Sequence, residues 1–180
     1  MIMTNEAVID TAAAPAAPAH APHAVVLPEA PARVNLARTA PALFRAVLGL
    51  DAAARQGLDP ALVELVQIRA SQLNGCAYCL HMHTGDARKA GESEERLHLV
   101  TVWREAAHFF SAAEQAALAL TEALTLVARD GVPEEVYARA AEQFAEPELA
   151  QLIGLICTIN TWNRIALVSG KVAGTDERRR

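Results

Sequence analysis

The chain has 180 residues, of which 52% are hydrophobic and 4% aromatic, and this length fits one domain with a sizeable core. Its formal net charge is −5 and it has no long basic run, so we expect neither nucleic acid nor an anionic membrane as a partner. No apolar stretch approaches the roughly 18 residues of a spanning helix, and we expect no transmembrane segment.

The first 31 residues differ from the rest because they hold five of the nine prolines, among alanine repeats. Helices and strands do not tolerate proline at that density, so we predict a disordered Ala/Pro-rich tail over residues 1–32. Glu6 and Asp10 occupy the region that a signal peptide makes basic, and we expect a cytoplasmic protein. Residues 33–172 are predicted to form the single domain and residues 173–180 a charged C-terminal tail.

Helix-start and helix-stop signals fill the chain after this tail. Pro41 suits a first helical turn, Asp59-Pro60 is an N-cap followed by proline, and Asn74-Gly75 suits a helix end. Ser111 and Glu114 have the spacing of a capping box. No alternating segment is bounded by hairpin turns, so we predict an all-α fold of about seven helices without a sheet. Five of the predicted helices have both ends marked, and these run from Pro60 to Leu73, from Cys76 to about Ala90, from Ser93 to Val100, from Ser111 to about Arg129 and from Pro147 to about Val168. Two more helices are predicted to begin near Pro41 and at Pro133.

The segment from Pro60 to Leu73 is apolar around nearly its whole circumference. A helix of this kind is buried on all sides, so we expect it at the centre of the fold or sealed by a partner subunit, and we predict a homo-oligomer. Glu64 lies in its middle, in an apolar setting. Because a buried carboxylate without a partner is costly, Glu64 is expected to have a partner or a chemical purpose.

Two nearby cysteines carry the most specific pattern of the chain. At about 100° of rotation per helical residue, Cys76, Cys79 and His83 project from one face, whereas His81 points away. Both cysteines would occupy the first helical turn, where the helix dipole favours a thiolate. His83, one turn beyond Cys79, is placed to accept its proton, and Glu64 from the preceding helix is placed to carry or store it. The pattern predicts a thiol redox site.

Other interpretations of the pattern remain open. The two cysteines and His83 would supply three zinc ligands, so a zinc-stabilised structural protein is an alternative, although Cys157 and the other histidines lack ligand spacing. Haem attachment is excluded because Leu80 follows the second cysteine, and we expect no metal or other cofactor. A non-enzymatic redox sensor or thiol-disulfide adaptor would use the same cysteines. Cys157 is predicted to be a small core residue.

These residues resemble the AhpD-like alkylhydroperoxidases of the carboxymuconolactone decarboxylase superfamily. The match consists of Glu64, eleven residues, Cys76-Ala77-Tyr78-Cys79, three residues and His83. The resemblance as a whole covers about residues 33–172. Two further stretches also look like family sequence, and these are Trp103-Arg104-Glu105 and Asn160-Thr161-Trp162-Asn163-Arg164.

The resemblance implies an all-helical chain that assembles as a homotrimer or homohexamer and acts as a thiol-dependent hydroperoxide reductase, an antioxidant peroxidase. Glu64 and His83 map onto the proton relay of the family, and Cys76 and Cys79 onto its redox-active disulfide pair. A peroxide substrate is implied, with a lipoyl or thioredoxin-like protein as the dithiol reductant. Tyr78 stands where the best-studied branch has a second histidine, which bears on turnover but leaves the cysteine pair intact.

The two cysteines are expected to have different roles. Cys79 is predicted to attack the peroxide and Cys76 to resolve the resulting sulfenic acid. His83 is one turn from Cys79 but about 10 Å of helix rise from Cys76, and a general base must reach the proton that it removes. The helix dipole favours Cys76 at least as much, whereas the family resemblance points to Cys79.

Overall fold

The computed structural model describes residues 26–29 and 33–175, and within these residues the chain forms nine α-helices, two short 3-10 turns and no strand. The prediction of an all-α fold is confirmed. Most of the tail predicted over residues 1–32, and most of the tail predicted over 173–180, lie outside the described residues. The helices are α1 (Leu36–Thr39), α2 (Pro41–Ala54), α3 (Pro60–Leu73), α4 (Ala77–Lys89), α5 (Glu94–Leu99), α6 (Ala112–Thr125), α7 (Val127–Asp130), α8 (Glu134–Gln143) and α9 (Glu146–Val168).

The helix boundaries follow the local signals. The Asp59 carboxylate caps α3 by accepting from the amides of Ala61 at 2.9 Å and Leu62 at 3.0 Å, and the expected capping box of Ser111 opens α6. One boundary differs from the prediction, because the helix expected to reach about Arg129 ends at Thr125. Leu126 has φ −101° and ψ 19°, which interrupts the helix, and the short α7 follows.

Helix α3 lies at the centre of the fold, as its apolar circumference predicts. Leu65, Val66 and Ile68 have no exposed surface, because α3 packs against α4, α6 and α9. Its residues belong to two hydrophobic clusters, one shared with α9 and α8 and the other with α4 and α5. The apolar surface of α3 is therefore covered within one chain, and its pattern gives no argument for a partner subunit.

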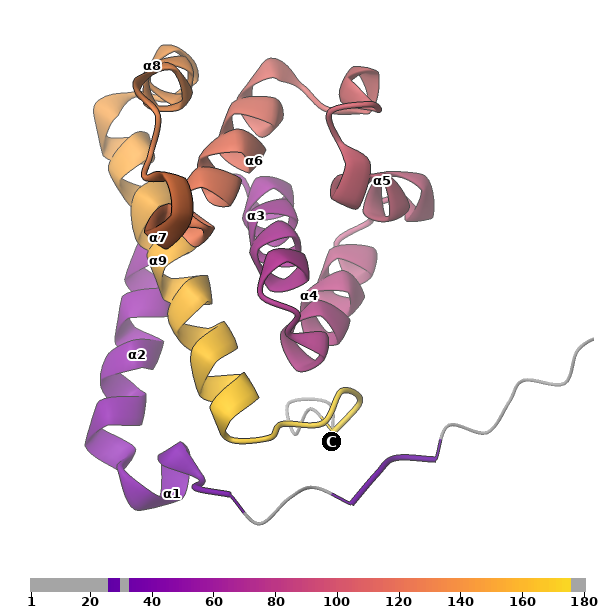
Figure 1. Cartoon of the computed structure of the whole chain (residues 1–180), viewed down its shortest axis with the longest axis vertical. Coiled ribbons are helices and arrows are strands. Elements are labelled where there is room, and N and C mark those ends of the chain that lie inside the picture. The colour runs from indigo at the N-terminus through magenta and orange to yellow at the C-terminus, as the bar shows by residue number, and fades with distance from the viewer. Residues whose placement is uncertain (1–25, 30–32, 176–180) are drawn as a thin grey trace, which may run out of the picture.

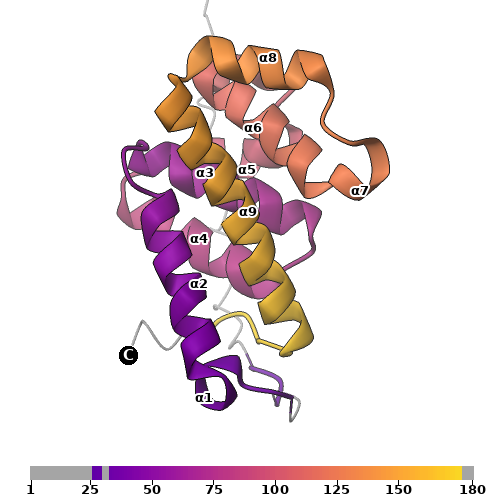
Figure 2. The same ribbon diagram turned by 90° about the vertical axis from the view of Figure 1, so that its left-hand side faces the viewer.

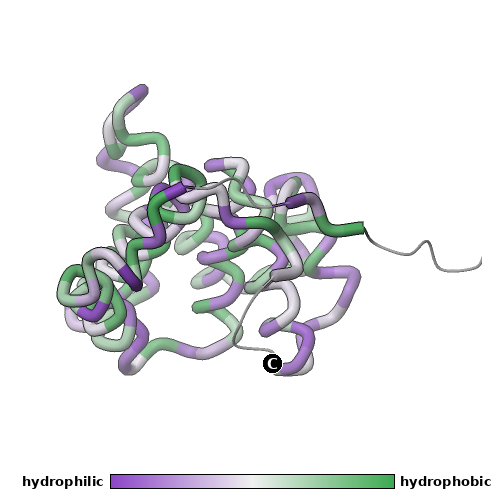
Figure 3. Tube along the Cα trace, turned by 90° about the horizontal axis from the view of Figure 1, so that it is seen from below, coloured by the Kyte–Doolittle hydropathy of each residue, from purple (hydrophilic) through white to green (hydrophobic). Residues whose placement is uncertain are grey.

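Helices α2 and α9 lie side by side in two perpendicular views (Figures 1 and 2). The 23-residue α9 crosses α3 and also contacts α4, and α8 lies across the end of the bundle in Figure 2. Hydrophobic and hydrophilic residues alternate along the helices (Figure 3), as expected where one helix face is buried. Within the described residues, none of the helices has both the length and the apolar character needed to cross a bilayer.

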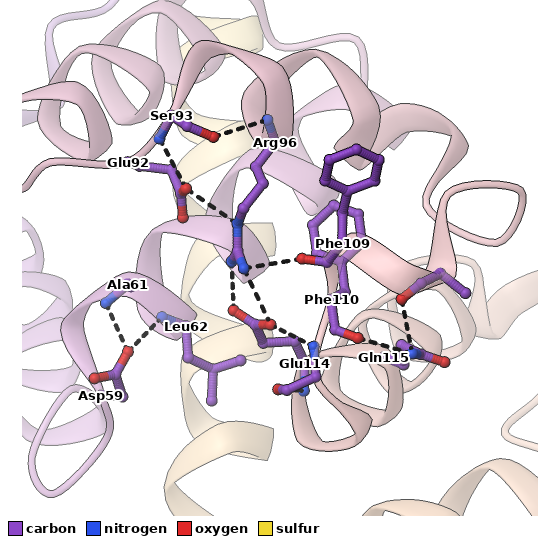
Figure 4. Close-up of polar contacts among 12 residues, drawn as sticks. Asp59, Ala61, Leu62, Glu92, Ser93, Arg96, Phe109, Phe110, Glu114 and Gln115 are labelled. Carbon is purple, nitrogen blue, oxygen red and sulfur yellow. Dashed lines mark hydrogen bonds and ion pairs between the residues drawn. The ribbon is translucent and has the colours of Figure 1, made fainter.

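Ion pairs of Arg96 and a hydrogen bond of Trp103 hold the segment between α4 and α6. Arg96 of α5 contacts Glu114 at the start of α6, lies 3.0 Å from Glu92, and donates to the Phe109 carbonyl at 3.0 Å (Figure 4). Farther along, Trp103 Nε1 donates to Glu122 at 2.9 Å. Both contacts join the irregular segment to α6, so the family-like stretch around Trp103 has a structural role here.

Candidate active site

The two predicted redox cysteines lie at the start of α4, where Cys76 is the N-cap residue and Cys79 is in the first turn. The chain turns sharply from α3 into α4 through Gly75, whose φ of +65° suits glycine. The Cys76 amide donates to the Ser71 carbonyl at 2.9 Å, which fixes this turn. Both thiols are free and buried, and they pack against Ala166 of α9.

His83 and Glu64 meet as predicted. His83 Nδ1 lies 2.9 Å from Glu64 Oε2, and the imidazole is buried while the carboxylate is 12% exposed. Because a carboxylate only accepts, Nδ1 carries the hydrogen, and Nε2 is the nitrogen that is left to take a proton. His83 is one turn after Cys79, so the two side chains are neighbours on one face of α4.

Arg55, the residue after α2, is a site residue that the sequence did not indicate. Its Nη1 lies 3.4 Å from Glu64 Oε1, its Nε donates to Asp51 at 2.8 Å, and its Nη2 donates to Gln67 at 3.0 Å. Glu64 therefore has a cationic partner in addition to His83. The expectation that this carboxylate has a partner is confirmed, and the line of contacts runs from Arg55 through Glu64 to His83.

The contact between the two thiols sets their acidity. The hydrogen bond from the Cys79 thiol lowers the pKa of Cys76 to about 7 against the effect of burial, and the amides at the start of α4 add to this lowering. The contact with Cys76, together with burial, raises the pKa of Cys79. The pair therefore loses its first proton near neutral pH and retains the second. The pKa of Cys76 is the lower of the two, whereas the position of His83 one turn after Cys79 favours Cys79 as the thiolate.

A pocket of about 340 Å³ opens beside this site, between α1, α2, α4 and α9. Among the described residues that line it are Cys79 and His83, but not Cys76. Two of the aromatic side chains that line it, Phe44 and Trp162, pack edge to face with ring centroids 5.4 Å apart. The pocket is mainly apolar, and its other apolar lining residues include Leu36, Leu48, Met82 and Ile165.

Cys157, the third cysteine, does not lie in the site, and the prediction that it is a core residue is wrong. Cys157 is exposed, because the buried face of α9 follows Leu152, Ile156 and Ile159. Cys157 lies five residues after Leu152, which is about 140° away around the helix. In the part of the chain that the structure describes, no three His, Cys, Asp or Glu side chains are grouped so as to hold a metal ion.

Sequence comparisons give one family and one curated relative. The profile of the Carboxymuconolactone decarboxylase family matches residues 41–123, which include Glu64, both cysteines of the pair and His83. The uncharacterized protein YdfG of Bacillus subtilis (strain 168) is 39% identical over 144 residues, which make up 79% of this chain and 97% of YdfG.

Solved structures show the same fold. ATU0492 from Agrobacterium tumefaciens, a protein of unknown function described as a candidate antioxidant defence protein AhpD, is 34% identical, with a TM-score of 0.75 over 80% of this chain and 99% of its own. The debrominase Bmp8, solved with 2,3,4-tribromopyrrole, has a TM-score of 0.66 over 75% of this chain and 73% of its own. At 19% identity, Bmp8 is similar in fold alone.

Proposed function

Because the chain belongs to the carboxymuconolactone decarboxylase family and has the AhpD-like all-α fold, we propose that it is a thiol-dependent hydroperoxide reductase. One observation carries this proposal, namely that Cys79 and His83 line one apolar pocket while His83 is hydrogen-bonded to Glu64. A thiol, an imidazole and a carboxylate beside a space for substrate support the proposal. Cys76, three residues before Cys79, supplies the second thiol that a disulfide requires.

The reaction begins with the removal of one proton from the cysteine pair. His83 Nε2 takes this proton, and Glu64 stabilises the imidazolium that forms. The proton that remains is shared along the hydrogen bond between the two thiols. When it sits on Cys76, the thiolate is on Cys79, at the wall of the pocket.

The peroxide is then reduced by a two-electron step. The Cys79 thiolate attacks the terminal oxygen of the hydroperoxide, the O–O bond breaks, and Cys79 becomes a sulfenic acid. The departing alkoxide takes the proton from His83 and leaves as an alcohol. Cys76 then attacks the sulfenic sulfur, so that a Cys76–Cys79 disulfide forms and water is released. An external dithiol reduces this disulfide by exchange and is itself oxidised to a disulfide.

Charge and access favour different cysteines as the attacker. The lowered pKa belongs to Cys76, whereas Cys79 faces the pocket. We assign attack to Cys79, because an anion that cannot meet the substrate does not react, and the proton can move between the two sulfurs. Peroxide in the presence of a sulfenic-acid trap distinguishes the roles: Cys76→Ser should accumulate trapped sulfenate on Cys79, and Cys79→Ser should accumulate little. The opposite pattern would reverse the assignment.

The pocket favours an organic hydroperoxide over hydrogen peroxide. Its volume of about 340 Å³ is many times the roughly 30 Å³ that one water molecule occupies, and apolar side chains line it. Transfer of an apolar substrate body into this space is favourable at about 25 cal/mol per Å². We expect a higher kcat/KM for cumene hydroperoxide than for hydrogen peroxide, and the reverse order would contradict this assignment.

The assembly and location are also part of the proposal. Several large apolar residues of α2 and of the end of α9 are exposed, and they include Leu43, Leu48, Leu50, Leu167 and Val168. Exposed apolar surface on two helices in contact is typical of an interface, and it supports a homotrimer or homohexamer. A lipoyl or thioredoxin-like protein in the cytoplasm, where thiols stay reduced, would serve as the reductant. Light scattering that gives a monomer at micromolar concentration would contradict the assembly.

The decisive test is steady-state turnover. The full-length protein is mixed with cumene hydroperoxide and dihydrolipoamide, and hydroperoxide consumption is compared with that of the double variant Cys76→Ser/Cys79→Ser. We expect turnover that is lost in the double variant. Equal rates would rule out a peroxidase. Disulfide formation in a single round without turnover would instead identify a redox sensor or thiol-disulfide adaptor.

A further inference from the structure

Asn163 on α9 links this helix to the turn that presents the cysteine pair. Its side chain has no exposed surface, its Nδ2 donates to Ser71 Oγ at 3.1 Å, and its Oδ1 accepts from Asn74 Nδ2 at 2.8 Å. Both partners adjoin the first cysteine, because the Ser71 carbonyl accepts the Cys76 amide and Asn74 is two residues before it. Asn163 therefore holds the start of α4 from the neighbouring helix.

The orientation of the amides in this network follows from an arginine. Arg164 can only donate, and its Nη1 lies 2.9 Å from Asn160 Oδ1. Asn160 Nδ2 accordingly donates elsewhere, to Thr125 Oγ1 at 3.0 Å. Asn74 Nδ2 donates to the oxygens of both Asn160 and Asn163. With its oxygen occupied by Asn74, Asn163 presents its Nδ2, which has two hydrogens and uses one on Ser71.

Ala166, three residues after Asn163 and on the same face of α9, packs against both cysteines, so Asn163 lies on the side of α9 that faces the pair. After the thiol–thiol hydrogen bond and the opposing effect of burial, the Asn163 side chain is among the groups that lower the pKa of Cys76. It also lowers the pKa of Cys79 against the larger raising effects of Cys76 and burial. An N–H donor stabilises a thiolate and not a thiol, which accounts for the lowering effect of Asn163 on both cysteines.

We infer that Asn163 is a positioning residue that fixes the first turn of α4 and donates an N–H to whichever cysteine of the pair carries the negative charge. The inference rests on the proposed redox role of the pair, but its measurement does not require peroxide turnover. It gives a chemical purpose to the family-like stretch Asn160–Arg164, which the hydroperoxide mechanism leaves unused.

Other charged and titratable groups line the pocket beside the pair or contact His83, and a test has to separate Asn163 from them. These groups are Asp51, Arg55, Glu64, Tyr78, His83 and Lys171. None of them is altered by a substitution on the buried face of α9. A matched control is Asn160, on the same helix and in the same amide network, which is not among the groups that shift the pKa of Cys76 or Cys79.

The experiment compares Asn163→Ala with Asn160→Ala in the full-length protein, by the rate of iodoacetamide alkylation as a function of pH, with the modified cysteine identified by mass spectrometry. Loss of one N–H donor to a charged group should raise the alkylation midpoint by about one pH unit, and lower the rate at pH 7 about fivefold, in Asn163→Ala. Asn160→Ala should keep the wild-type midpoint. A shared shift, or no shift in Asn163→Ala, would overturn the inference.

A second variant distinguishes the loss of the N–H donor from a folding defect. Asn163→Asp keeps the side-chain shape and the oxygen that accepts from Asn74, but replaces the N–H donor with a carboxyl group, so the midpoint should rise at least as far. Loss of folding in both Asn163 variants would assign the residue to stability alone and would also overturn the inference. The proposed function can fail separately: absence of turnover together with a shifted midpoint would reject the peroxidase and keep the role of Asn163.

Discussion

Replacement of Glu64 by glutamine tests the proton relay with little disturbance of the fold. Glutamine has the shape of glutamate and keeps an oxygen that can accept from His83 or Arg55. Arg55, which is partly exposed, retains Asp51 at 2.8 Å and Gln67 at 3.0 Å as partners. Since no charge loses its last partner, the free energy of unfolding should change by less than about 1 kcal/mol.

The effect of Glu64→Gln on the reaction should be larger. Glu64 Oε2 lies 2.9 Å from His83 Nδ1, and its negative charge stabilises the imidazolium that forms when His83 takes a proton from the cysteine pair. A hydrogen bond to a charged group contributes about 1.5–3 kcal/mol and one between neutral groups about 0.5–1.5 kcal/mol, so loss of the charge costs about 1–1.5 kcal/mol. We therefore expect kcat/KM for cumene hydroperoxide to fall about 5- to 12-fold, with a changed pH profile.

A matched control separates the relay from a general effect on Arg55. Gln67→Met removes another partner of Arg55 at a fully buried position but does not touch His83, so its turnover should stay close to that of the wild type. Steady-state kinetics and urea unfolding would be measured on the same samples. Full activity of Glu64→Gln with an unchanged pH profile would refute the relay. Equal losses in both variants would assign the effect to Arg55, and an unfolded Glu64→Gln would show that Glu64 is structural.

Thiol acidity, core burial and the exposed cysteine give three further expectations. Alkylation of the cysteine pair should accelerate as the pH rises through about 7, since the thiolate reacts and the thiol does not; Cys79→Ala, which leaves Cys76 without the second thiol, should raise this midpoint, and an unmoved midpoint would contradict the thiol–thiol hydrogen bond. Ile68→Ala, at a fully buried position, should lower the free energy of unfolding in urea by about 2–5 kcal/mol, and an unchanged value would contradict the central place of α3. A bulky maleimide should label the folded wild-type protein at Cys157, and Cys157→Ser should remove this label while leaving turnover and stability unchanged; a wild-type protein that is not labelled at Cys157 would contradict the exposure of this residue.

The contact between Glu64 and His83 was predictable because it depends on one tight turn. Asn74-Gly75 ends α3 and directs the chain into α4, which packs against α3. In two helices joined by so short a turn, residues at similar distances from the turn come together. Glu64 is ten residues before Asn74 and His83 is eight after Gly75, so sequence spacing alone brings these two side chains close.

Arg55 and Asn163 were beyond sequence reasoning because each reaches the site from an element whose placement no local pattern fixes. Arg55 follows α2, and Asn163 lies on α9, 84 positions after Cys79. Their roles depend on how α2 and α9 pack beside α3 and α4. The error on Cys157 was of another kind: apolar neighbours suggested burial, whereas counting helical positions from Leu152 would have placed it on the outer face of α9.

The central position of α3 makes unfolding of the helical bundle cooperative. Because α3 contributes side chains to both hydrophobic clusters, neither half of the bundle can separate without exposing apolar surface of this helix. Unfolding of the bundle should then be a single cooperative event, and the amides of α3 should exchange with solvent deuterium only through global unfolding. The α1 turn and the residues after α9, which border the pocket, can exchange by local fluctuations. Substrate can therefore enter and leave through movements of these borders while Glu64, held on α3, stays in place against His83.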